Sequence, residues 1–109
     1  DGIRAVYEFT SPVPTFSTLT TKVESQTQQS LVQFVDLYDF TANQFVQVGS
    51  YLPSSTDTVH SAIAANPARF MHPQTKALRL RLRYRLFQAS TAPIPFVRIG
   101  IDSIGIELR

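Results

Sequence analysis

Residues 78–86 read LRLRLRYRL, and this stretch decides the fold. Its apolar residues occupy the even positions and its arginines the odd ones. Because successive side chains of a β-strand point to opposite faces, this alternation predicts a long strand with one buried face. The apolar row consists of Leu78, Leu80, Leu82, Tyr84 and Leu86, and we expect it to face Val97, Ile99 and Leu37 across a sandwich.

Period-two alternation recurs on both sides of this strand. The pattern predicts further strands at residues 3–9, 18–25, 31–40, 45–48, 58–65 and 96–108. In the last of these, apolar residues occupy odd positions up to Ile101 and even positions from Ile104. An extra residue near Asp102 or Ser103, forming a β-bulge, would restore a single inward face.

Turn-forming residues separate the predicted strands. Pro12 and Pro14 forbid a continuous ladder, and residues 41–44 predict the turn of a hairpin. Asn66-Pro67 predicts the start of a short helical turn that ends at Pro73, and residues 88–95 are expected to form a loop. The sequence therefore predicts one all-β domain over residues 1–109, an antiparallel jelly-roll or Greek-key β-sandwich of seven to eight strands with one short helical turn.

Composition favours a secreted or cell-surface protein. Charged residues make up only 17% of the 109 residues, the polar surface is rich in Thr, Ser and Gln, and cysteine is absent. The lack of cysteine excludes disulfides, thiolate metal sites and a cysteine nucleophile. No apolar run is long enough to predict a membrane span. A first residue of Asp1 instead of Met leads us to expect a processed product or an excised domain.

The sequence predicts that the chain is not an enzyme. Its two histidines, His60 and His72, lie in neither a nucleophile-elbow nor a zinc-hydrolase motif, and no glycine-rich phosphate loop is present. The carboxylates form no pattern that distinguishes a catalytic pair from ordinary polar residues of strands.

The arginine row of residues 79–85 has two main interpretations. The four side chains would lie about 6.5–7 Å apart along one face of a sheet. They could pair with Glu8, Glu24, Asp36 or Glu107 on neighbouring strands, which is a structural role. Alternatively, they could form a cationic platform for an anionic glycan. Nucleic acid is not predicted as a partner, because the basic residues are not interleaved with exposed aromatic ones along the chain.

The candidate ligand-binding residues include two tyrosines besides the arginines. Tyr38 and Tyr51 keep a polar group in water while offering a ring on which a sugar can stack. No organic cofactor is expected, but a structural calcium ion is a further candidate. Its oxygen ligands would come from Asp102, Glu107 and Glu8, and the candidate glycan-binding residues are Arg79, Arg81, Arg83, Arg85, Tyr38 and Tyr51.

Three stretches resemble parts of known modules. Residues 35–46, with Leu37-Tyr38-Asp39-Phe40-Thr41, resemble an "LYDW-T-x-x-W-V" hairpin of accessory domains in large secreted bacterial proteins, and have Phe40 and Phe45 in place of its tryptophans. Residues 78–84 are similar to an "L-R-x-R-x-R-Y" strand of the same modules. Residues 101–108 are similar to an "ID-x-I-x-L" last strand of carbohydrate-binding jelly rolls. The resemblance implies a non-catalytic bacterial module appended to an exported hydrolase or a surface protein.

Two functions follow as hypotheses. The first is an extracellular accessory module that binds a polysaccharide, and the arginine row would suit an anionic one such as a sulfated or uronic-acid polymer. The alternative is a structural module of a surface or filament-forming protein, whose edge strands and apolar patches pack on neighbouring protein modules. Exposure separates them, because clustered Tyr and Arg favour a glycan while an unprotected apolar edge strand favours assembly.

Overall fold

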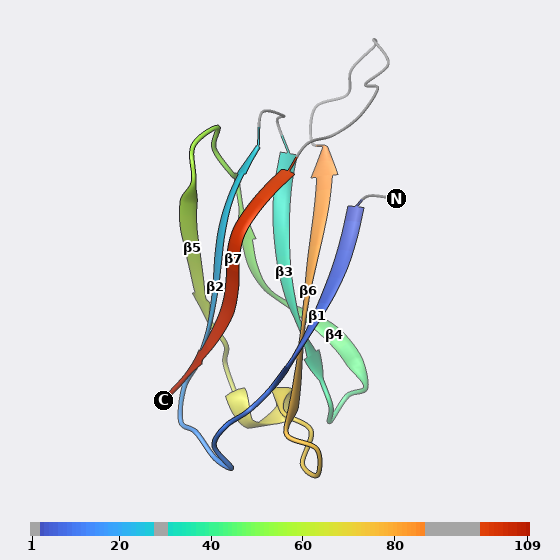
Figure 1. Cartoon of the computed structure of the whole chain (residues 1–109). Helices are drawn as coiled ribbons and strands as arrows, with labels where there is room; N and C mark the ends of the chain where they lie inside the picture. Colours follow the sequence, from blue (N-terminus) through green and yellow to red (C-terminus); the bar gives the residue numbers. More distant parts are fainter. Residues whose placement is uncertain (1–2, 28–30, 87–98) are drawn as a thin grey trace.

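The computed structural model describes residues 3–27, 31–86 and 99–109, which form seven strands and one 3₁₀ helix (Figure 1). The predicted loop at residues 88–95 and the start of the last strand at 96–98 lie outside the described residues. The elements are β1 (Ile3–Thr10), β2 (Leu19–Thr27), β3 (Leu31–Asp39), β4 (Gln44–Tyr51), β5 (Thr58–Ile63), η1 (Pro67–Phe70), β6 (Ala77–Leu86) and β7 (Ile99–Leu108).

The strands form two antiparallel sheets that pack face to face. One sheet has four strands in the order β1-β6-β3-β4, and the other has three in the order β5-β2-β7. The β3–β4 hairpin joins neighbours directly, whereas the other connections pass between the sheets. Figure 1 shows the two layers, with η1 near one end of the sandwich. The predicted all-β sandwich is confirmed, and within the described ranges η1 is its one helical segment.

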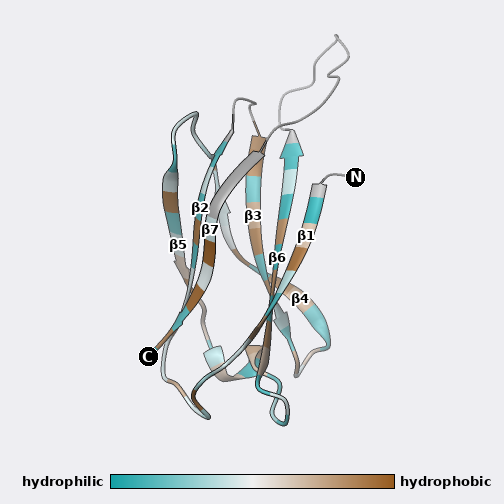
Figure 2. Cartoon of the chain, viewed as in Figure 1, coloured by the Kyte–Doolittle hydropathy of each residue, from teal (hydrophilic) through white to brown (hydrophobic). Residues whose placement is uncertain are grey.

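Strand β6 presents its apolar side chains to the space between the sheets. Leu78, Leu80, Leu82 and Tyr84 are at most 5% exposed, as the alternation predicts, and hydrophobic and hydrophilic residues alternate along the strands in Figure 2. Leu37 is also buried, but its predicted place across the sandwich is wrong. It lies beside Leu80 in the same sheet, because β3 pairs directly with β6. The side chains of Leu86, Val97 and Ile99 are outside the described part.

Strand β2 supplies the opposing wall of the core. Leu19 and Val23 are fully buried, and the β7 residues Ile104, Ile106 and Leu108 pack against the same cluster. This inward row of β7 depends on the predicted bulge, which is confirmed. Glu24 is paired with Ser103 and Ser25 with Ile101, so Asp102 is the extra residue that shifts the register.

A second bulge, in β4, was not predicted. Val35 is paired with Gly49 and Asp36 with Gln47, so Val48 is the extra residue. Because a one-residue shift moves every later side chain to the other face of a sheet, the bulge turns Tyr51 toward the core. Without it, Tyr51 would share the outer face with Phe45.

A buried polar network joins the two sheets. The side-chain amide of Gln33, which is fully buried, donates from Nε2 to Ser25 Oγ at 3.0 Å and to Tyr84 Oη at 2.7 Å. Burial raises the pKa of Tyr84, and the hydrogen bond from Gln33 opposes this rise. These hydrogen bonds pair Gln33 Nε2 and the hydroxyl groups of Ser25 and Tyr84 inside the core, whereas Gln33 Oε1 has no hydrogen-bond partner among the described residues.

The helical turn begins where the sequence predicts and ends earlier. Asn66 precedes it in the left-handed region, with φ 52°, and makes no side-chain capping hydrogen bond. Met71 is already extended, so the turn stops at Phe70 and not at Pro73.

Truncation of Leu82 tests the assignment of the core. We expect Leu82→Ala to lower the free energy of unfolding by about 2–5 kcal/mol, because a buried leucine leaves a cavity when it is shortened. Urea denaturation measures the effect. Val6→Ala, at a residue that is 56% exposed on β1, is the control, and we expect it to change stability by less than about 0.5 kcal/mol. Equal effects of the two changes would contradict this core.

Candidate functional site

The outer surface of the four-stranded sheet gathers most of the chain's arginines. The odd positions of β6 point away from the core and lie between outward side chains of β1 and β3. We call this surface the arginine face, and it comprises Arg4, Val6, Glu8, Phe34, Asp36, Tyr38, Phe45, Gln47, Arg79, Arg81, Arg83 and Arg85.

Asp36 lies at the centre of the arginine face and is only 1% exposed. Its Oδ2 accepts hydrogen bonds from Arg81 Nε at 2.8 Å and from Arg83 Nε at 2.5 Å, and its Oδ1 accepts one from Arg83 Nη2 at 2.9 Å. The hydrogen bond and the charge of Asp36 raise the pKa of Arg83. A carboxylate can be buried here because two guanidinium groups replace its water.

Aromatic rings from β3, β4 and the turn between them lie beneath the arginines. The guanidinium carbon of Arg81 is 4.2 Å from the ring centroid of Phe45, and that of Arg83 is 4.7 Å from Phe34. Arg79 lies over both Tyr38 and Phe40, at 5.3 and 5.2 Å. These distances allow cation–π attraction. Basic and aromatic residues therefore do interleave across neighbouring strands, although they do not interleave along the chain. Nucleic acid was not predicted because such interleaving is missing along the chain, and the pairing of the strands removes that reason.

The ends of the arginine row are more exposed than its centre. Arg79 donates from Nε to Glu8 Oε1 at 3.1 Å, with both side chains at least 40% exposed. Arg85 is exposed at the other end, and Arg4 on β1 lies directly opposite Arg83. Within the described residues, no ion pair or hydrogen bond links the side chain of Arg4 or Arg85 to another residue.

Of the two candidate tyrosines, Tyr38 belongs to the arginine face and Tyr51 does not. Tyr38 packs edge-on against Phe40 and Phe45. Tyr51 faces the core, where it stacks on His60 with ring centroids 4.6 Å apart, and burial raises its pKa. Its ring covers Gly49, at which a Cβ would lie 2.6 Å from the Tyr51 hydroxyl.

The structure does not bring the candidate calcium ligands together. Glu8 pairs with Arg79 on the arginine face, whereas Glu107 lies on the three-stranded sheet beside Arg109 and Lys22, at 3.0 and 3.6 Å. The hydrogen bond from Arg109 and the neighbouring cations lower the pKa of Glu107. The side chain of Asp102 lies outside the described part, and the described residues contain no cluster of three metal-ligating side chains. Calcium binding stays a prediction.

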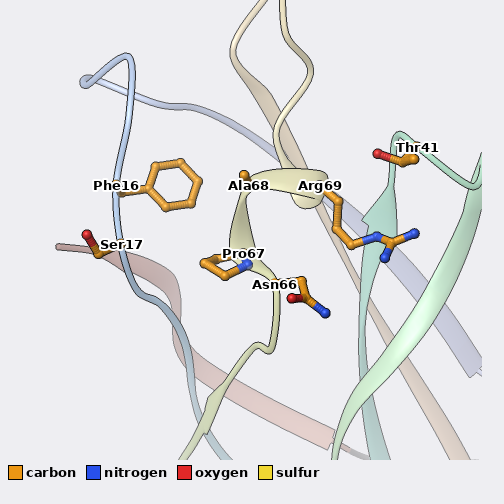
Figure 3. A pocket seen from close by; sticks show the side chains of 7 residues that line it. All are labelled: Phe16, Ser17, Thr41, Asn66, Pro67, Ala68 and Arg69. Carbon is orange, nitrogen blue, oxygen red and sulfur yellow. The ribbon is translucent and has the colours of Figure 1, made fainter.

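An open pocket of about 660 Å³ lies at the end of the sandwich that carries η1 (Figure 3). Its polar wall includes Arg69, whose Nε is 2.6 Å from Asp39 Oδ2. Asp39 Oδ1 accepts hydrogen bonds from the backbone amides of Thr41 and Ala42 at 2.8 and 2.9 Å. Burial raises the pKa of Asp39, but these amides and the charge of Arg69 outweigh it, so the pKa lies below its ordinary value.

The part of the chain that the structure describes contains no helical segment that could serve as a membrane-spanning helix. Comparison with known proteins finds no matching family model, no matching curated protein and no matching solved structure. The resemblance to accessory modules of secreted proteins therefore stays a prediction, and the candidate site rests on its geometry alone.

The predicted pairing of the arginine row with carboxylates is present for Glu8 and Asp36. Glu24 and Glu107 lie on the three-stranded sheet instead.

Sequence reasoning missed the burial of Asp36 and the place of Arg4. The signal for Asp36 was weak, since Gln33 and Asp39 also interrupt the apolar residues of the predicted strand 31–40. Arg4 was expected to point outward on the first strand, but its place opposite Arg83 depends on the pairing of β1 with β6, which no local pattern reveals.

The arginines of the row differ in what their removal does to stability. We expect Arg83→Ala to lower the free energy of unfolding by about 1.5–3 kcal/mol, because it removes charged hydrogen bonds from a buried carboxylate. Arg79→Ala removes an exposed pair, so its effect should stay below about 1 kcal/mol. Chemical denaturation of both variants at neutral pH makes the comparison. An equal effect would show that Asp36 does not need its second guanidinium.

Proposed function

We propose that the chain is a non-catalytic binding module, acting outside the cell, whose arginine face binds an anionic polysaccharide. The arginine face holds five of the chain's eight arginines and two of its eight carboxylates. The chain as a whole carries a formal charge of only +2, so the positive charge is concentrated on one surface. Such a surface attracts a polymer that carries repeated negative charges.

The observation that carries the proposal is the cluster of Arg4, Arg83 and Arg85. Like charges directly opposite each other on neighbouring strands are unfavourable. Arg4 and Arg83 have this arrangement, and Arg85 is the next outward residue of β6. Among the described residues, the one carboxylate that contacts Arg83 is Asp36, which also binds Arg81. A sulfate or carboxylate of a ligand placed between these arginines would relieve the repulsion.

The remaining arginines are held in place for binding. Arg79 and Arg81 are fixed through Nε, and in the described part of the chain their terminal nitrogens make no hydrogen bond to the protein. Planar guanidinium groups bind carboxylates and sulfates through paired donors. Because the side chains are already ordered, less conformational entropy is lost when an anion binds.

A glycan fits this surface better than a single-stranded nucleic acid. Non-specific binding of single strands relies on open ring faces on which bases stack. The rings of Phe34 and Phe45 are partly buried and have a guanidinium group over them. The surface thus offers more hydrogen-bond donors than uncovered aromatic rings on which bases could stack.

Retention on heparin, alginate and pectin columns tests the proposal. We expect the double variant Arg4→Ala/Arg85→Ala to bind at least about tenfold more weakly at low salt, because each charged hydrogen bond contributes about 1.5–3 kcal/mol. Rising salt should weaken wild-type binding, since screening shortens the range of the charges. The fold should be unaffected, as neither arginine has a described partner.

The matched control is Lys22→Ala/Arg109→Ala, which removes two positive charges from the other sheet. It should bind like the wild type. Equal losses in the two double variants, or no retention of the wild type, would rule out the arginine face as the binding surface. Tighter binding to single-stranded DNA or RNA than to every glycan would show that the ligand class is wrong.

A specific observation favours assembly as the second candidate function. Edge strand β5 exposes Val59 and Ile63, which are 56% and 74% accessible. An exposed apolar edge strand is a template for pairing with another chain. Light scattering over a concentration series should show an assembled state that Ile63→Lys abolishes if the chain is a structural module. A wild type that stays monomeric at all concentrations would exclude this function.

A further inference from the structure

The pocket beside η1 is separate from the arginine cluster. It lies between the loop that follows β1, the β3–β4 turn and η1, whereas Arg4 and Arg85 lie at the opposite end of the four-stranded sheet. Its volume of about 660 Å³ is typical of small-molecule sites, which span roughly 300–1,000 Å³. Figure 3 shows the side chains that line it.

One wall of the pocket offers a fixed positive charge. Both ends of Arg69 are held, because its backbone carbonyl accepts the amide of Phe40 at 2.8 Å and its Nε lies against the buried Asp39. The side chain is nevertheless 39% exposed, and no hydrogen bond is made by its terminal nitrogens within the described residues. These nitrogens form a planar donor pair suited to a carboxylate.

Asn66 stands beside that charge. Its φ of 52° lies in the left-handed region, which asparagine adopts more readily than most residues other than glycine. Its side-chain amide makes no capping hydrogen bond to η1, although asparagine at this position ordinarily does. Asn66 lines the pocket, so its amide offers a donor and an acceptor there, and Thr41 lines the pocket as well. In Figure 3 the hydroxyl group of Ser17 points away from η1.

The opposite wall is apolar. The ring of Phe16 points toward Pro67 and Ala68 of η1, as Figure 3 shows. Phe16 is partly buried against the core, which fixes its position. A ligand that fits both walls has an apolar ring face, several hydroxyl groups and one carboxylate.

From this arrangement we infer that the pocket binds a single hexuronic acid residue, with its carboxylate on Arg69, its hydroxyl groups near Asn66 and its C–H face on Phe16. The inference rests on the proposed function for the class of ligand, since a uronic acid is the repeating acidic unit of such polymers. The residue could be the end of a polysaccharide chain or a free sugar acid, and the experiment distinguishes these sources.

Titration with glucuronate, followed by ¹H–¹⁵N NMR, tests the inference on the whole chain. We expect saturable shifts of the Arg69 Nε–H and Asn66 side-chain amide signals, and weaker or no shifts with glucose, which lacks the carboxylate. Arg69→Gln should weaken glucuronate binding about tenfold or more, the fold-change that a charged hydrogen bond provides. Absent shifts, equal responses to glucose and glucuronate, or unchanged binding by Arg69→Gln would overturn the inference.

A second variant keeps the inference testable if Arg69→Gln does not fold. Asn66→Gly removes the amide, and glycine adopts the left-handed conformation without strain, so the variant should fold normally. It should bind glucuronate about threefold more weakly or worse, as expected for loss of a neutral hydrogen bond. Full affinity in this folded variant would contradict the part assigned to Asn66.

The arginine-face variant Arg4→Ala/Arg85→Ala separates this inference from the proposed function. It should lose polymer retention and keep glucuronate binding. In one outcome the polymer is retained while neither oligouronates nor glucuronate shift the NMR signals of the pocket residues. That result would overturn the inference and leave the proposed function standing. Glucuronate binding without polymer retention would overturn the proposed function and identify a site for the free acid. Pocket shifts with oligouronates as well as glucuronate would identify the chain end as a source.

Discussion

The core and the outer surface of the four-stranded sheet both depend on strand β6, because its two faces carry different side chains. Its inward leucines fill the space between the sheets, and its outward arginines need carboxylates and rings to pack against. Asp36 on β3 and Glu8 on β1 supply the carboxylates, so the same strand that organises the core also orders the outer surface. A slip of one residue in its pairing would bury the arginines and expose the leucines, which makes this register strongly specified.

Burial of Asp36 divides the arginine row into two groups with different roles. A carboxylate that is 1% exposed would be strongly unfavourable alone, and Arg81 and Arg83 together stabilise it. Substitution of these two arginines would therefore change stability together with the proposed binding, and cannot separate the two effects. Arg4 and Arg85 have no such structural task within the described residues, and the binding capacity of the arginine face is tested most cleanly there.

Local patterns reveal much of this fold because side-chain period is a local property. The strand at residues 77–86 and the bulge at Asp102 follow from period two and from its interruption. The bulge at Val48 leaves no such interruption, since apolar Val46 and Val48 keep one phase and the change appears only in pairing with β3. For that reason Tyr51 was placed among ligand-binding candidates although it faces the core. The positions of Leu37 beside Leu80 and of Arg4 opposite Arg83 depend on strand order, which composition and spacing do not encode.

The same arrangement of an arginine beside a carboxylate occurs at both candidate sites. A carboxylate fixes the Nε side of Arg69, Arg79 and Arg81, and leaves the terminal nitrogens of each guanidinium group toward solvent. Nearby rings or backbone then limit the remaining rotation, so the donor pair keeps its direction before any ligand arrives. A flexible lysine would lose more rotamer freedom for each hydrogen bond formed and could not offer two parallel donors. This explains why a chain with only two lysines can present a cationic surface, and why the proposed anion binding would depend on the elements that hold the arginines.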